Sequence, residues 1–164
     1  MKYNNRSEDR LLLGNRGWRD FGGGFEVASG HSLEAMIFQC NHLNLPMGLL
    51  EQKFQIAYKP RKTGDQEIPV LELTTSEQPP MSVIIDPETG LIRQVNGQIT
   101  MGSHGVVMGV GYSDYRKVNG VMLPFRLVNY VNGRPIAESN YGSVEVNVSL
   151  NPDTFTPPLL KKNN

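Results

Sequence analysis

YSDYRKVNGVMLPFRL, residues 112–127, carries the clearest fold signal in this sequence. Two alternating stretches flank Asn119-Gly120, a pair that is typical of a two-residue hairpin turn. Pro124 has no backbone N–H to donate, so it indicates an edge strand or a bulge. The charged residues beside the two tyrosines suggest either a catalytic or ligand-binding loop or a solvated rim hairpin. The rim hairpin is the simpler interpretation, because neighbouring charges at a strand end form exposed ion pairs.

The same alternation extends from this hairpin in both directions. Alternating or strand-like stretches occur at 54–58, 68–75, 81–85, 91–100, 106–112, 121–131 and 144–150. Short turns separate them at 86–90, 119–120 and 132–133, as in an antiparallel meander. Each stretch has one apolar and one polar face, so we expect a sheet with one wet side. The sequence predicts a mainly β fold, a curved antiparallel sheet of about eight strands with one main helix.

The last strand of this series is predicted to share its inner face with the hairpin. We expect Val121, Leu123, Phe125 and Leu127 to point to the same side as Val144, Val146 and Val148. A register slip of one residue would expose all of them, so the register should be firmly fixed.

One amphipathic helix is predicted, from about Ser32 to Leu43, with Ser32 as its N-cap. Its apolar residues recur at helical spacing and form one stripe, and Phe38 lies roughly opposite, so we expect the helix to pack on one surface and to offer Phe38 to another. Pro46 ends the helix, and residues 46–50 are expected to form a further short turn. The stripe, which we expect to face the sheet, consists of Leu33, Met36, Ile37, Cys40 and Leu43.

Length and charge limit the possible functions. The 164 residues predict one domain, 1–164, with flexible tails at 1–10 and 159–164. Sixteen basic residues balance sixteen acidic ones, which argues against nucleic acid or an anionic membrane surface as the partner. No apolar run is long enough to span a membrane. The polar N-terminus lacks the apolar stretch of a secretory signal, so we expect the chain to begin inside a mature protein or to be cytoplasmic.

No catalytic or metal constellation is recognisable in the sequence. One metal ion cannot hold His31 and His42, about 16 Å apart along a helix. The histidines are therefore expected to be solvated or locally hydrogen-bonded. The stretch from Gly102 to Gly111 lacks the spacing of a nucleophile elbow or a phosphate loop. We expect a protein that is not an enzyme and needs no cofactor or metal.

Residues 14–158 resemble the LolA-like superfamily, the periplasmic lipoprotein carriers and their relatives. The resemblance is carried by RGWRD (16–20), SLEAMIFQCNHLNLP (32–46), VIIDPETGLI (83–92), SDYRKVNGVMLPFRL (113–127) and VEVNVSLNPDTFTPP (144–158). It implies an incomplete, strongly curved antiparallel β-barrel with a helix over its concave face, where acyl chains bind. It also implies a periplasmic or otherwise extracytoplasmic location.

The chain departs from this family at its N-terminus. Family members usually begin with a signal peptide, a helix and several strands, whereas this match begins at a middle strand. We therefore expect a fragment, a truncated product or a shortened relative. No residue of this chain matches the arginine that latches the lid helices in the carriers.

Two functions are expected from these features. The first is binding of lipid or lipoprotein acyl chains in the apolar concave face. The alternative is a non-catalytic interaction or sensor domain of the same fold, without lipid cargo, and a homodimer through an open sheet edge. The candidate cavity residues are Leu33, Met36, Ile37, Cys40, Val106, Met108, Val110, Leu123, Phe125 and Leu127.

Overall fold

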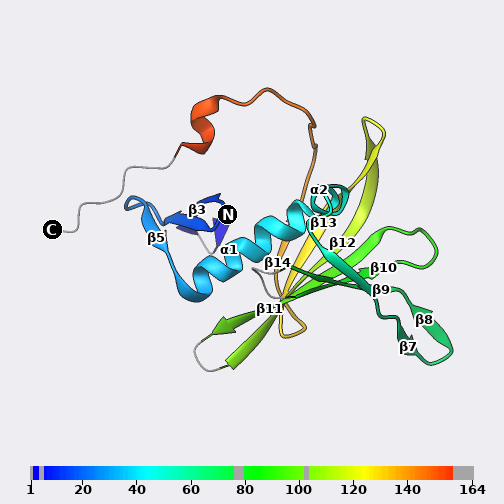
Figure 1. Ribbon diagram of the computed structural model, residues 1–164. Helices are drawn as coiled ribbons and strands as arrows, with labels where there is room; N and C mark the ends of the chain where they lie inside the picture. Colours follow the sequence, from blue (N-terminus) through cyan, green and yellow to red (C-terminus); the bar gives the residue numbers. More distant parts are fainter. Residues whose placement is uncertain (1, 4–5, 76–79, 102–103, 157–164) are drawn as a thin grey trace.

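The computed structural model in Figure 1 describes residues 2–3, 6–75, 80–101 and 104–156. Over these residues the fold is mainly β, with four antiparallel sheets, two α-helices and a short 3-10 helix, η1 (Pro152–Phe155). The predicted fold class is thereby confirmed at the level of a mainly β, antiparallel protein with a main helix.

The largest sheet has seven strands in the order β14-β13-β12-β11-β10-β9-β6. Its strands are β6 (Gln55–Tyr58), β9 (Val70–Thr74), β10 (Met81–Ile85), β11 (Ile92–Met101), β12 (His104–Val118), β13 (Val121–Val131) and β14 (Arg134–Asn140). From β9 to β14 each strand pairs with the next in sequence, so the predicted meander is confirmed. A hairpin of β7 (Arg61–Thr63) and β8 (Gln66–Ile68) interrupts the connection from β6 to β9. Among the described strands none joins β6 to β14, so the sheet has two open edges.

The predicted turns between these strands are present. Asn119 and Gly120 have φ values of 48° and 91°, and Asn132 and Gly133 have 49° and 76°. Two successive left-handed residues are what a two-residue hairpin with the twist of β-strands requires. The β10–β11 turn is held by Asp86, whose carboxylate accepts from the backbone N–H of Thr89 at 2.9 Å.

The N-terminal part forms a separate three-stranded sheet of β3 (Asp9–Leu13), β4 (Arg16–Asp20) and β5 (Glu26–Ala28). Before it, β1 (Lys2–Tyr3) pairs with β2 (Arg6–Ser7). The predicted flexible tail at 1–10 is therefore wrong for its second half. Glu8 is only 4% exposed, because Arg10 and Arg19 neutralise it. The predicted tail at 159–164 lies outside the described residues.

Two helices follow, α1 (Gly30–Leu43) and α2 (Leu45–Leu50). The N-cap is Ser29 and not the predicted Ser32, whose hydroxyl instead donates to the Ser29 carbonyl at 2.8 Å. Asn44 ends α1, and Pro46 lies in the first turn of α2, so the predicted interruption and second short element are confirmed. In Figure 1, α1 lies between the three-stranded sheet and the seven-stranded sheet.

Both sides of α1 are packed, as expected for a helix with a stripe on one side and Phe38 on the other, but the stripe does not face the seven-stranded sheet as predicted. Phe38 is buried against the seven-stranded sheet, where a Cβ added to Gly97 would lie 2.6 Å from its ring. Met36 and Leu33 of the predicted stripe pack instead on Gly17 of β4. Leu43, at the end of that stripe, is 56% exposed. The stripe was assigned to the wrong sheet because Gly97 of β11 has no side chain and leaves room for the Phe38 ring. Phe38 lies on the helix face that periodicity marks as the outer one.

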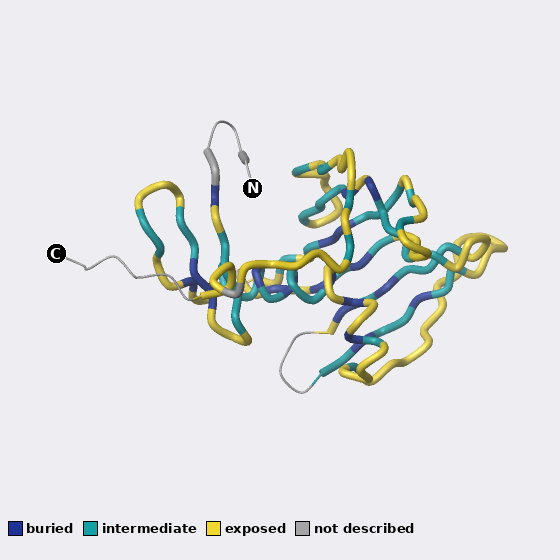
Figure 2. Tube along the Cα trace, turned by 90° about the horizontal axis from the view of Figure 1, so that it is seen from above, coloured by how far each residue is buried: buried dark blue, intermediate teal, exposed yellow. Residues whose placement is uncertain are grey.

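The main core lies between the helices and the seven-stranded sheet. Figure 2 shows the buried segments in the central part of the molecule and the exposed segments mostly in its loops. The core combines two helical side chains with side chains from five neighbouring strands: Phe38, Leu45, Leu73, Met81, Val83, Val95, Val110 and Leu127.

The predicted strand at 144–150 is wrong. Residues 141–151 are irregular, and Val148 and Leu150 are 47% and 58% exposed. The place beside β13 is taken by β14. That strand is fastened by Arg126, whose guanidinium makes two hydrogen bonds of 2.9 Å to the Glu138 carboxylate. The predicted inner face shared by β13 and 144–150 therefore does not form, and Val121 is exposed.

Candidate ligand-binding cavity

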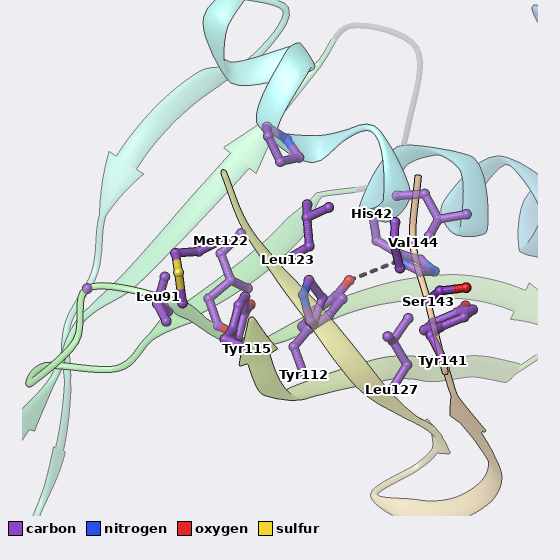
Figure 3. Close-up of a pocket in the computed structure, with 15 residues that line it drawn as sticks. His42, Leu91, Tyr112, Tyr115, Met122, Leu123, Leu127, Tyr141, Ser143 and Val144 are labelled. Atoms are coloured by element: carbon purple, nitrogen blue, oxygen red, sulfur yellow. Dashed lines mark hydrogen bonds between the residues drawn. The ribbon is translucent and has the colours of Figure 1, made fainter. Parts of the chain in front are cut away.

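A cavity of about 520 Å³ lies between the α1–α2 junction and the β12–β13 hairpin. Figure 3 shows its side chains, with Leu91, Met122 and Tyr115 on one side, Tyr141, Ser143 and Val144 on the other, and Tyr112 between them. Most of the lining is aliphatic or otherwise apolar: Leu43, Pro46, Gly90, Leu91, Ile92, Met122, Leu123, Pro124, Leu127 and Val144. The polar lining residues are His42, Tyr112, Tyr115, Tyr141 and Ser143.

A left-handed residue in β12 shapes one wall. Positions 112 and 115 would lie on opposite faces of a regular strand, yet Tyr112 and Tyr115 both line the cavity. Asp114 lies between them with φ of 52°, and the ladder pairs Ser113 with Arg126 and then Tyr115 with Pro124, leaving Asp114 out. The interruption therefore gives the cavity two tyrosines from one strand.

The charged residues of the stretch 112–127 lie outside the cavity. Arg116 pairs with Asp114 at 2.6 Å, and both side chains are about half exposed. The Arg116 guanidinium lies over the ring of Phe125, 4.3 Å from its centroid. Pairing of β13 with β14 ends at Arg126, so Pro124 lies beyond the end of that ladder. This arrangement agrees with the predicted rim hairpin and with the predicted edge position of the proline.

His42 and Tyr112 join the helix to the sheet across the cavity. The Tyr112 hydroxyl lies 2.8 Å from His42 Nδ1, as the dashed line in Figure 3 marks. The His42 ring also packs against Phe38, with 5.5 Å between ring centroids. Burial lowers the pKa of His42 to about 4, so the imidazole is neutral at pH 7. Burial raises the pKa of Tyr112 as well, with a smaller contribution from Tyr115, so the phenol stays protonated.

Tyr115 is also engaged with the protein. Its hydroxyl donates to the Ile92 carbonyl at 2.6 Å, and burial raises the pKa of Tyr115 to about 12. The deep polar groups of the cavity thus hydrogen-bond to the chain itself. A ligand would therefore contact mainly aromatic and aliphatic surface. Tyr141 and Ser143, which also line the cavity, are exposed to solvent.

Two of the ten candidate residues line this cavity, Leu123 and Leu127. Val110 and Leu127 belong to the core, Met108 packs against it, and Phe125 is buried under Arg116. Val106 is half-buried in β12.

The four helical candidates lie elsewhere. Met36 and Cys40 line a second cavity of about 560 Å³, formed with residues 8–12. Leu33 packs on Gly17, and Ile37 is half-buried. The structure therefore does not bring the predicted helical residues to the cavity of Leu123 and Leu127.

Sequence reasoning missed His42, Tyr112 and Tyr115 as cavity residues. It expected solvated or locally hydrogen-bonded histidines, whereas the buried His42 is bonded to a residue seventy positions away. The available signal was the tyrosine pair flanking an aspartate in β12. That signal was assigned to the rim because the neighbouring charged residues were expected to face water.

The described residues contain no group of three His, Cys, Asp or Glu side chains placed to hold a metal ion. Within the same residues, no helix has the length and hydrophobicity needed to cross a bilayer. Comparison with family models, with curated proteins and with solved structures finds no match to this chain.

Proposed function

We propose that this protein binds an acyl chain of a lipid or lipoprotein in the cavity between the α1–α2 junction and the β12–β13 hairpin. The observation that carries the proposal is the cavity of about 520 Å³ with its largely apolar lining. Its size falls in the range of about 300–1,000 Å³ of small-molecule sites. Apolar walls with a few fixed polar groups suit a hydrocarbon chain better than a polar metabolite.

The energetics of burial support this assignment. Removing about 200 Å² of acyl-chain surface from water is worth about 5 kcal/mol at roughly 25 cal/mol per Å², before the costs of binding. The ligand needs no hydrogen bonds from the deep wall, because the His42–Tyr112 and Tyr115–Ile92 pairs are satisfied within the protein. Binding therefore requires displacement of water from an apolar space and little else.

The resemblance to the LolA-like superfamily supports the same proposal. In this proposal the seven-stranded sheet is an incomplete β-barrel, α1 and α2 lie over its concave face, and the protein works as a periplasmic carrier without catalysis. The linear strand order with two open edges is compatible with an incomplete barrel. The site lies at the C-terminal end of α1 and not under the predicted stripe.

The proposal is tested by filling the cavity. Val144 lines it, whereas Val148 lies in the same irregular segment, is exposed and does not line it. We expect a fluorescent ester of dodecanoic acid to bind the wild type saturably, Val144→Trp to weaken binding at least tenfold, and Val148→Trp to bind like the wild type. Absence of saturable binding to the wild type, or equal effects of the two substitutions, would contradict the proposal.

A second candidate function is recognition of a protein strand, including a second copy of this chain. It is favoured by β6, an outer strand of the seven-stranded sheet whose four residues are all exposed, Ile56 and Tyr58 among them. Unpaired outer strands recruit other strands. Sedimentation of the ligand-free protein distinguishes this function, since a homodimer that Ile56→Lys dissociates would support it and a monomer at all concentrations would contradict the dimer.

A further inference from the structure

The following inference rests on the proposed function and specifies its ligand class. We propose that the cavity selects uncharged acyl compounds, in which the chain ends in an ester or amide, and excludes free fatty acids and alkylammonium ions. The argument concerns the charges and hydrogen bonds of the cavity wall.

The wall carries no formal charge over the described residues. The fifteen lining residues include neither Lys, Arg, Asp nor Glu. The Arg116–Asp114 ion pair of the same hairpin is about half exposed and lies outside the lining, and its two charges neutralise each other. A ligand charge inside the cavity would therefore meet no opposite charge.

The titratable groups of the wall cannot supply the missing charge. His42 of α1 is held neutral by burial, and Tyr112 and Tyr115 of β12 are held protonated by burial. Turning His42 into a cation for a carboxylate would require protonating a buried ring whose Nδ1 already contacts a phenol at 2.8 Å. The wall therefore stabilises neither a negatively nor a positively charged ligand group.

The hydrogen-bonding groups of the deep wall are also committed. Tyr115 donates to the Ile92 carbonyl, and Tyr112 pairs with His42. Against the deep wall an ionised carboxylate would lose its water without gaining donors, because Tyr112, His42 and Tyr115 are already hydrogen-bonded, and this loss is strongly unfavourable. An ester or amide carbonyl has a far smaller desolvation cost and can lie near Ser143 and Tyr141, which are exposed.

The experiment uses three competitors of equal chain length against the fluorescent ester: methyl dodecanoate, dodecanoate and dodecylammonium. At pH 7 a carboxyl group with pKa of about 4–5 is ionised. We expect methyl dodecanoate to displace the probe with a Kd at least tenfold below those of both ions, which corresponds to about 1.4 kcal/mol. Equal or tighter binding of dodecanoate, with the probe still bound saturably, would overturn this inference while leaving the proposed function standing. No binding of the probe itself would remove both.

A charge placed at the exposed end of the cavity provides a second test. Ser143→Lys introduces a cation beside the wall, whereas Gln66→Lys makes the same change in the exposed β7–β8 hairpin, outside the lining. We expect Ser143→Lys to strengthen dodecanoate binding at least fivefold and to weaken dodecylammonium binding, with Gln66→Lys changing neither. Identical behaviour of the two variants would contradict the assigned role of the uncharged wall.

Discussion

Glu8 shows how a residue from a polar N-terminal stretch becomes part of the interior. Its carboxylate accepts from Arg10 at 2.6 Å and from Arg19 at 2.5 Å, and Arg10 also donates to Gln39 of α1 at 3.0 Å. Burial by itself would raise the pKa of Glu8, but the hydrogen bonds from the two arginines outweigh it and hold that pKa below its ordinary value. The carboxylate form therefore stabilises the link between the three-stranded sheet and α1.

We expect Glu8→Gln to lower the free energy of unfolding by about 1–3 kcal/mol at pH 7, the range for a hydrogen bond to a charged group. Because the folded pKa is depressed, this stabilisation is present above the ordinary glutamate pKa and is lost as pH falls through the folded pKa. The difference between wild type and variant should therefore shrink toward acid pH. Denaturant titrations at a series of pH values measure it, with the exposed Glu145→Gln as the control.

The same residues show what the sequence could not reveal at this scale. A polar run such as residues 6–10 is typical of a tail, and it is the placement of Arg10 and Arg19 beside the Glu8 carboxylate that makes burial of Glu8 possible. Tyr115 was likewise assigned to the rim with its charged neighbours, and the left-handed conformation of Asp114 is not encoded in alternation. Leu123 and Leu127 line the cavity, but so do Met122 and Pro124, so regular alternation does not describe this part of β13.

Among the elements, α1 is packed from two sides by different sheets. Periodicity identified the stripe that carries Met36, which contacts Gly17 of β4. It could not identify Phe38 as the residue facing the seven-stranded sheet. The orientation of the helix is determined by Gly97 in β11, which has no side chain and so leaves room for the Phe38 ring. No pattern within the helix sequence indicates the position of this glycine. Existence and length of the helix were predictable, whereas its orientation depended on a distant strand.

The Phe38–Gly97 contact gives a prediction for this element. Phe38→Ala should cost about 3–5 kcal/mol of stability, as for a buried aromatic side chain, and Ile37→Ala clearly less. Gly97→Ala should also destabilise, because its Cβ would lie 2.6 Å from the Phe38 ring. In the Phe38→Ala background the same glycine substitution should cost much less. Additive costs in this double-mutant cycle, measured by urea unfolding, would contradict the contact.

The C-terminal segment shows a second limit of prediction from patterns. Residues 144–150 alternate well, yet the strand beside β13 is β14, which contains Pro135 and little apolar alternation. Two factors favour β14: a tight Asn132-Gly133 turn that delivers it to β13, and the bidentate Arg126–Glu138 pair. The turn was recognised in the sequence, but the strand that follows it was not.

At the scale of the whole molecule, the two larger sheets share one helix. A small three-stranded sheet gains stability from packing its apolar side chains on another element, here α1. The single tryptophan, Trp18, is buried in β4 and so reports on the three-stranded sheet alone. Far-ultraviolet circular dichroism reports mainly on the larger sheet and the helices.

We therefore expect Trp18 fluorescence and circular dichroism to give the same denaturation midpoint, as in a two-state transition. Gly17→Ala, whose Cβ would approach Leu33 and Met36 to about 3.0–3.1 Å, should lower both midpoints together. An earlier transition in fluorescence than in circular dichroism would show instead that the three-stranded sheet unfolds independently.

The His42–Tyr112 contact also has a consequence for the order of folding. The wall formed by β12 and β13 is a single hairpin, so its contacts are local in sequence and close quickly. The opposite side of the cavity is supplied by α1. The His42–Tyr112 contact closes a loop of seventy residues, and the larger entropy cost of that loop delays formation of the contact. During synthesis α1 emerges first, and the β12–β13 wall that it packs against is synthesised much later. The cavity is thus completed only after most of the chain has left the ribosome.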